Sequence, residues 1–138
     1  MLCAAITETP GICQLQIAER SRASNHSSQA HGSNQAEGVR HTHQSVAVSL
    51  DSLQAYFPAP TILKIDVESA EIGVLRGASR LLQTVRPVIL CEVTPENSDT
   101  VANILHQHKY ELFEADADPA QRRPVRRAPW STLAIPNA

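Results

Sequence analysis

Apolar residues recur at every second position or in short runs in some stretches and at helical spacing in others, and these patterns predict strands and helices. The strongest signal is the apolar run from Ile62 to Asp66, which is interrupted by Lys64 and passes through acidic residues into a helical pattern. The apolar positions of that pattern share one helix face: Val74, Leu75, Ala78, Leu81 and Leu82. This order predicts a buried strand that runs directly into a helix packed on a sheet. Gly73 and Gly77 each cost about 1 kcal/mol against alanine inside a helix, which indicates close backbone packing.

Weaker patterns of the same kinds predict the other elements. A second apolar run from Val88 to Val93 predicts another buried strand, and it too carries an acid near its end, Glu92. Two-residue alternation predicts strands over Ile12 to Ala18 and around Val46 to Leu50. The remaining predicted elements are a strand at Leu2 to Ile6, a short helix capped by Asp51 and running through Leu53, Tyr56 and Phe57, a helix capped by Asn97 or Ser98, and strands at Tyr110 to Phe113 and Thr132 to Ile135.

Strands and helices alternate along the second half of the chain, which predicts an α/β fold. The order strand, helix, strand, helix, strand is typical of a doubly wound sheet, and Tyr110 to Ile135 is predicted to close it as a terminal antiparallel hairpin. A length of 138 residues fits a single domain. Arg20 to Ser45 is polar and has almost nothing to bury, so residues 20–45 are predicted to form a mobile loop.

Composition excludes several classes of partner. The formal net charge of -2 gives no excess of basic residues for nucleic acid or for an anionic membrane surface. The three cysteines are widely spaced and odd in number, so they predict neither a disulfide framework nor a zinc site. No stretch approaches 18 apolar residues, and the N-terminus has no basic region before an apolar one. These features favour a soluble cytoplasmic protein.

Carboxylates follow the two strongest predicted strands. If these strands lie parallel and close together, Asp66, Glu68 and Glu92 meet at one edge of the sheet, where α/β proteins bind ligands. Three carboxylates there would repel one another unless one holds a proton or a cation lies nearby. Such a site suits removal of a proton from a hydroxyl, or binding of a positively charged cofactor or a metal ion. The alternative is structural: Glu68 and Glu71 complement a helix dipole while Lys64 and Asp66 form an ion pair.

Histidines and arginines give less specific signals. His41 and His43, like His106 and His108, are two residues apart, but neither pair has a third ligand at a recognisable spacing, so no metal is predicted. His41 or His43 could still reach the acidic edge as an acid or base. The four arginines between Asp116 and Pro129 could clamp an acidic substrate, although compensation of nearby acids is the simpler interpretation. Trp130 is predicted to pack, and the glycine-rich nucleotide motifs are absent.

One segment resembles a known family. LKIDVESAEIGVLRGASRLL is similar to the central segment of FkbM-type S-adenosylmethionine-dependent methyltransferases, in which a strand reading K-I-D-V-E-G-A-E runs into a helix containing L-R-G-A. SVAVSLDSL and PVILCEV resemble flanking strands of the same family. The resemblance implies a Rossmann-like class I methyltransferase sheet, S-adenosyl-L-methionine as cofactor, and methyl transfer to a hydroxyl of a sugar or secondary metabolite.

The resemblance also implies roles for individual residues. Asp66 is expected nearest the donor methyl group and the acceptor, as both a catalytic and a cofactor-binding residue, with Glu68 as a supporting acid or base. Glu92 and His43 are expected to contact the acceptor. Residues 20–45 are expected to close over the substrate as a lid.

Two departures from the family pattern carry consequences. Met1 falls after the family's glycine-rich cofactor loop, so the chain is expected to be the C-terminal part of the domain and to bind S-adenosylmethionine weakly or not at all. It is also expected to expose a sheet edge through which it could self-associate. The alternative function is that of a non-catalytic α/β remnant that binds a protein partner. Ser69 stands where the family has glycine, which would weaken a turn of positive φ but would suit a helix N-cap.

Overall fold

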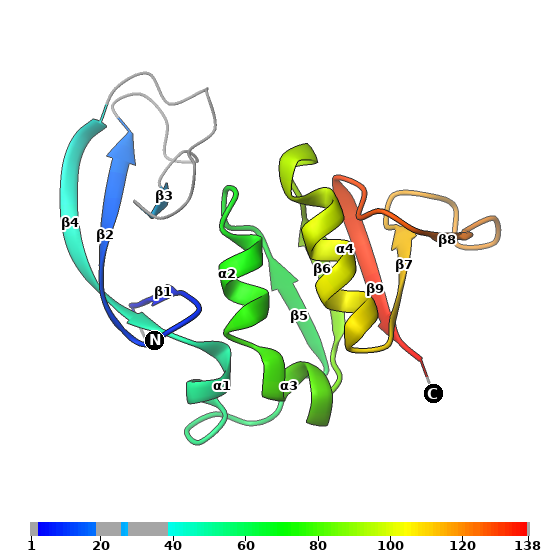
Figure 1. Cartoon of the computed structure of the whole chain (residues 1–138), viewed down its shortest axis with the longest axis horizontal. Helices are drawn as coiled ribbons and strands as arrows, with labels where there is room; N and C mark the ends of the chain where they lie inside the picture. Colours follow the sequence, from blue (N-terminus) through cyan, green and yellow to red (C-terminus); the bar gives the residue numbers. More distant parts are fainter. Residues whose placement is uncertain (1–2, 19–25, 28–38, 138) are drawn as a thin grey trace.

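The computed structural model describes residues 3–18, 26–27 and 39–137, which form two sheets and a layer of helices (Figure 1). The first sheet has the order β1-β4-β2-β3 and the second the order β5-β6-β9-β7-β8. The strands are β1 (Ala5–Ile6), β2 (Gly11–Ala18), β3 (His26–Ser27), β4 (Val39–Val48), β5 (Ile62–Ile65), β6 (Val88–Glu92), β7 (Tyr110–Glu114), β8 (Pro124–Val125) and β9 (Ser131–Pro136). The helices are α1 (Leu50–Leu53), α2 (Glu71–Arg76), α3 (Ser79–Thr84), the 3-10 helix η1 (Pro95–Asn97) and α4 (Ser98–Gln107).

The five-stranded sheet has the mixed α/β character that the sequence predicts. β5 and β6 are parallel neighbours, with Ile65 opposite Cys91, while β9 pairs antiparallel with both β6 and β7. The predicted terminal hairpin is therefore present, with β9 inserted between β6 and β7. Among the described residues, α2, α3 and α4 pack on one face of this sheet, so helices on both faces, as in a doubly wound sheet, stay a prediction.

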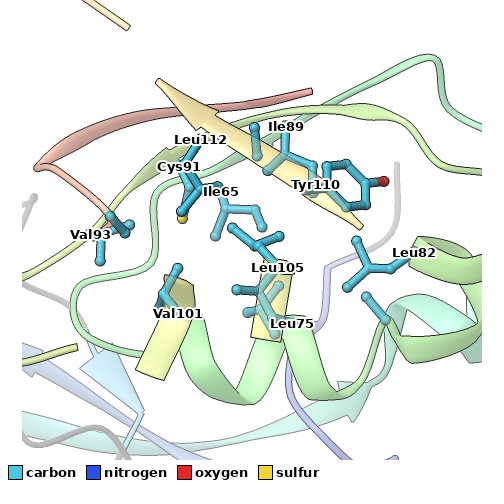
Figure 2. Close-up of a cluster of buried hydrophobic side chains, with 14 of the residues drawn as sticks. Ile65, Leu75, Leu82, Ile89, Cys91, Val93, Val101, Leu105, Tyr110 and Leu112 are labelled. Atoms are coloured by element: carbon cyan, nitrogen blue, oxygen red, sulfur yellow. The ribbon is translucent and has the colours of Figure 1, made fainter. Parts of the chain in front are cut away.

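The core lies between that sheet face and the helices (Figure 2). Each fully buried aliphatic side chain here stabilises the fold by about 1.5–3 kcal/mol. Its larger members are Ile65, Leu75, Leu82, Ile89, Val101, Leu105, Tyr110 and Leu112. The opposite sheet face leaves Ile62, Leu90 and Ile135 exposed. The prediction of a buried strand at Ile62 to Asp66 is wrong for Ile62, which is 64% exposed. Among the described strands β5 pairs with β6 alone, and the described helices cover one face of the sheet.

Gly77 divides the predicted single helix into α2 and α3. A Cβ at this position would collide with the carbonyl oxygen of Thr7 and lie 3.1 Å from Cα of Glu8, so only glycine lets the two backbones meet. The close packing inferred from the sequence is confirmed here, whereas a Cβ at Gly73 would make an ordinary contact at 3.9 Å. The turn between β1 and β2, which contains Thr7 and Glu8, therefore packs directly against the helical layer at Gly77.

Asp51 caps a helix other than the predicted one. Ser49 is the N-cap of α1, accepting a hydrogen bond from the amide of Ser52, and α1 ends at Leu53 rather than continuing to Phe57. The Asp51 carboxylate instead accepts hydrogen bonds from two amides at the start of α3, each at 2.8 Å. The prediction that Asp51 caps the helix it belongs to is wrong, because its carboxylate accepts from the free N–H groups of a helix distant in the sequence.

The predicted loop over residues 20–45 is wrong for its last part. Val39–Val48 forms β4, which pairs antiparallel with β2. The segment lacks apolar alternation because its described side chains from Thr42 to Gln44 are exposed, so its pairing rests on backbone hydrogen bonds. Apart from the short strand β3, the rest of the predicted loop lies outside the described residues.

Candidate acidic site at the ends of two parallel strands

Lys64 joins the carboxylates that follow β5 and end β6. Its ammonium donates to Oδ2 of Asp66 at 2.9 Å and to Oε1 of Glu92 at 3.0 Å. The side chains of Asp66 and Glu92 remain 51% and 42% exposed, so both oxygens are within reach of a ligand. The parallel register of β5 and β6 produces this meeting, because it aligns the carboxyl ends of both strands. The predicted ion pair of Lys64 with Asp66 is confirmed, and Glu92 extends it to a group of three.

The ammonium is the cation that the carboxylates require. The hydrogen bond to Asp66 and then that to Glu92 raise the pKa of Lys64, so it stays charged across the physiological range. One positive charge between two negative ones leaves a net negative edge. The ion pairs themselves are exposed and screened, so they orient the side chains more than they stabilise the fold.

A left-handed turn follows Asp66 and carries Glu68. Glu68 has φ 45° and Ser69 φ 68°, and the amide of Ala70 closes the turn on the carbonyl of Val67 at 3.2 Å. Left-handed backbone costs a non-glycine residue about 1–2 kcal/mol. Ala70, and not Ser69, occupies the N-cap position of α2. Of the two predicted consequences of serine at this position, the weakened turn of positive φ applies and the helix N-cap does not.

Glu71 and Asn97 were not predicted as parts of this site. Glu71 is 1% exposed, and its carboxylate accepts from the amide of Ser69 at 2.9 Å and from Nδ2 of Asn97 at 2.7 Å. Nδ2 of Asn97 also donates to the carbonyl of Ser69 at 3.1 Å. Asn97 holds the N-cap position of α4, but its side chain makes no capping hydrogen bond there. A signal for Glu71 exists in the sequence, because it falls on the same helix face as Val74 and Leu75, where an acid is unexpected.

Other polar groups lie near the end of β6. The hydroxyl of Thr94 is buried and has no hydrogen-bond partner. Burial raises the pKa of the Cys91 thiol to about 12, with a further contribution from Glu71, so this cysteine is protonated and unsuited to act as a nucleophile. The backbone of Trp130 accepts from the amide of Val93, but its side chain is 59% exposed, so the prediction that Trp130 packs is wrong.

The remaining candidates lie elsewhere. His43 is exposed on β4 of the first sheet, opposite Leu15, and its role in acceptor binding stays a prediction. His106 lies near the carbonyl oxygens of Tyr110 and Arg126. Within the parts of the chain that the structure describes, no group of three or more histidine, cysteine or acidic side chains could hold a metal ion.

Two of the four loop arginines serve the fold. Arg127 forms two hydrogen bonds with the carboxylate of Asp99, at 2.6 and 2.9 Å. Arg122 donates to the carbonyls of Ala115 and Ala117. For these two residues, charge compensation and loop support account for the contacts better than a substrate clamp.

The profile of one family, described as the methyltransferase FkbM domain, matches residues 3–112. No curated protein and no solved structure matches the chain. Residues 3–112 include β5, β6 and the turn that carries Glu68 and Ser69. None of the described helices is long and apolar enough to cross a membrane.

Proposed function

Because the chain belongs to the FkbM methyltransferase family, we propose that it takes part in S-adenosylmethionine-dependent transfer of a methyl group to a hydroxyl, with Asp66, Glu68 and Glu92 at the reacting edge. The observation that carries the proposal is the meeting of Asp66 and Glu92 around Lys64, at the aligned ends of two parallel strands. The acceptor is a small molecule or glycan bearing the hydroxyl. The family match does not favour the alternative role as a non-catalytic module.

The residues of this edge fit a cationic methyl donor. S-adenosylmethionine supplies a methyl group on a positively charged sulfur, which favours a region of negative potential. Asp66 and Glu92 provide two partly exposed carboxylates and Lys64 one ammonium, so the electrostatic potential at this edge is negative, as the donor requires. Their exposure leaves them available to a ligand without prior rearrangement of the core.

Attack by a hydroxyl requires that its oxygen be positioned and its proton be accepted. In this proposal Asp66 accepts the proton, with Glu68 as support; the position of Asp66 directly after β5 supports this role. The hydrogen bond from Lys64 orients the Asp66 carboxylate. Glu92, on the neighbouring strand, would orient the acceptor hydroxyl.

A pair of nuclear magnetic resonance titrations tests whether this edge prefers a positively charged ligand. The full chain is titrated with S-adenosylmethionine and, separately, with S-adenosylhomocysteine, which lacks the sulfonium charge. We expect shifts at the amides of residues 64–69 and 92, and a preference for the charged ligand that Asp66→Asn reduces about tenfold. Asp116→Asn makes the same chemical change at an exposed loop acid and should leave the preference unchanged. Equal shifts with both ligands, or shifts confined to other residues, would contradict the proposal.

Methyl transfer itself is measured with a panel of monosaccharides and glycosides and detected by mass spectrometry. Formation of a methyl ether that depends on Asp66 is the expected result. Methylation of an amine or a carboxylate in place of a hydroxyl would show that the acceptor class is wrong while the donor is right.

A further inference from the structure

We propose that Glu71 and Asn97 are positioning residues that hold Asp66 and Glu68 at the reacting edge by closing the left-handed turn and fastening it to the start of α4. The inference rests on the proposed function for its consequence, but its geometry is independent of it. Glu71 is buried and Asn97 half-buried, and the hydrogen bonds described above join them to the turn and to each other.

The three hydrogen bonds fix both peptide groups of Ser69. Its N–H donates to Oε1 of Glu71, and its carbonyl accepts from Nδ2 of Asn97. Nδ2 of Asn97 also donates to Oε2 of Glu71, so the side chains of Asn97 and Glu71 are joined directly. With both of its peptide groups held, Ser69 is kept at φ 68°, a conformation that serine seldom adopts. The direction in which the chain leaves Asp66 and Glu68 is set by this arrangement.

Asn97 also connects the two strands of the site. It belongs to η1, which follows β6, whereas the turn follows β5. The bonds of Asn97 therefore tie the segment after Asp66 to the segment after Glu92. Parallel pairing aligns the strands as far as Ile65 and Cys91, and the Asn97 bridge continues that alignment beyond the last paired residues.

A role in core packing alone does not explain Glu71. Its position on the apolar face of α2, next to Val74 and Leu75, would suit an aliphatic side chain. Burial of a carboxylate is unfavourable unless hydrogen bonds compensate it. Both bonds of this carboxylate go to groups that shape the turn: the amide of Ser69 and Asn97. The acid is therefore placed where the turn needs acceptors.

Asn97→Ala tests the inference, with Ser98→Ala as a matched control. Ser98 is the next residue, is buried, and donates to the carbonyl of Ala128 at 2.6 Å, away from the turn. Hydrogen exchange is followed at the Ser69 amide and at Leu105 in the core. Asn97→Ala should accelerate exchange at Ser69 about tenfold more than at Leu105, while Ser98→Ala should change both alike.

Ser69→Gly provides a rescue that a general loss of core packing in Asn97→Ala would not show. Glycine adopts a positive φ without steric cost, so adding Ser69→Gly to Asn97→Ala should restore much of the ordering of the turn. The perturbation of the S-adenosylmethionine titration caused by Asn97→Ala should be restored with it. The inference would be overturned if Asn97→Ala accelerated exchange equally at Ser69 and Leu105. It would also be overturned if Ser69→Gly restored neither the exchange nor the titration. If the unmodified chain shows no response to S-adenosylmethionine, the proposed function fails, while the exchange measurements still decide the role of Asn97 in the turn.

Discussion

The carboxylate of Asp51 accepts a hydrogen bond from the amide of Leu81, thirty residues further along the chain, at 2.8 Å. A second one from Arg80 makes Asp51 the cap of α3, although it belongs to α1. In addition, the amide of Asp51 donates to the carbonyl of Gly77 at 2.9 Å. The end of the first sheet is thereby attached to the helices that cover the second.

Asp51→Ala should lower the free energy of unfolding by about 1–2 kcal/mol, because two amides at the start of α3 lose their acceptor. Urea denaturation followed by circular dichroism measures the change. Asp116→Ala, at an exposed loop position, serves as control and should stay within about 0.5 kcal/mol of the unmodified chain. Equal stability of the two variants would contradict the assigned cap.

Ser69→Gly should raise the free energy of unfolding by about 0.5–1 kcal/mol, because glycine removes the cost of the left-handed backbone. Ser79→Gly is the matched control: this exposed serine opens α3, where glycine is unfavourable, so stability should fall. Both variants are compared by thermal and urea denaturation. Loss of stability in both would mean that the turn does not impose the positive φ.

Stability should fall above about pH 9 because of Cys91. Burial raises its folded-state pKa from 9.0 to about 12, so the unfolded chain releases the thiol proton first as the pH rises. The stability held below pH 9 is lost progressively up to pH 12, by about 2 kcal/mol at pH 10.5. Cys91→Ala is less stable at neutral pH because it leaves a cavity, but its stability should decline less between pH 8 and pH 10.5. Parallel decline of the two proteins in urea denaturation would assign the alkaline loss to other groups.

Lys64→Val should increase self-association through β5. Among the strands that the structure describes, β5 pairs with β6 alone, and it carries exposed Ile62 close to the charge of Lys64. A lysine on an edge strand opposes pairing with another copy. Light scattering after size-exclusion chromatography should show a larger dimer fraction. Glu111→Val adds the same side chain on β7, which has neighbours on both sides, and should leave the distribution unchanged; a similar rise in both variants would point to general apolar association.

The sequence predicts the parts of the fold that depend on local apolar patterns. β5, β6, β7 and β9 and the core face of α2 follow from such patterns, and the meeting of Asp66 with Glu92 follows from parallel pairing. The first part of β4 could not be found in this way, because its described side chains are exposed and polar.

Contacts between a side chain and a distant backbone group are beyond such patterns. Asp51 and Asn97 both stand where a local cap is expected, and a single sequence does not show that their acceptors and donors lie elsewhere in the fold. The exposure of Ile62 likewise depends on which strands surround β5. Glu71 is different, since an acid within an apolar helix face is visible in the sequence and marks a buried polar contact.

Gly77 lies at the boundary between the first sheet and the helices that cover the second, and this boundary is called the seam. Among the described contacts, the first sheet meets the helical layer through backbone groups packed against this glycine and through Asp51. The exposed ion pair between Arg76 and Glu8 and the side chain of Ile6, which packs against the core, add to this contact. The five-stranded sheet keeps its own core without them. A side chain at position 77 should therefore uncouple two folding units, so that Gly77→Ala loosens β1, β2 and β4 in hydrogen exchange while β6 and β9 stay protected. The acidic site lies on the more resistant side of that seam.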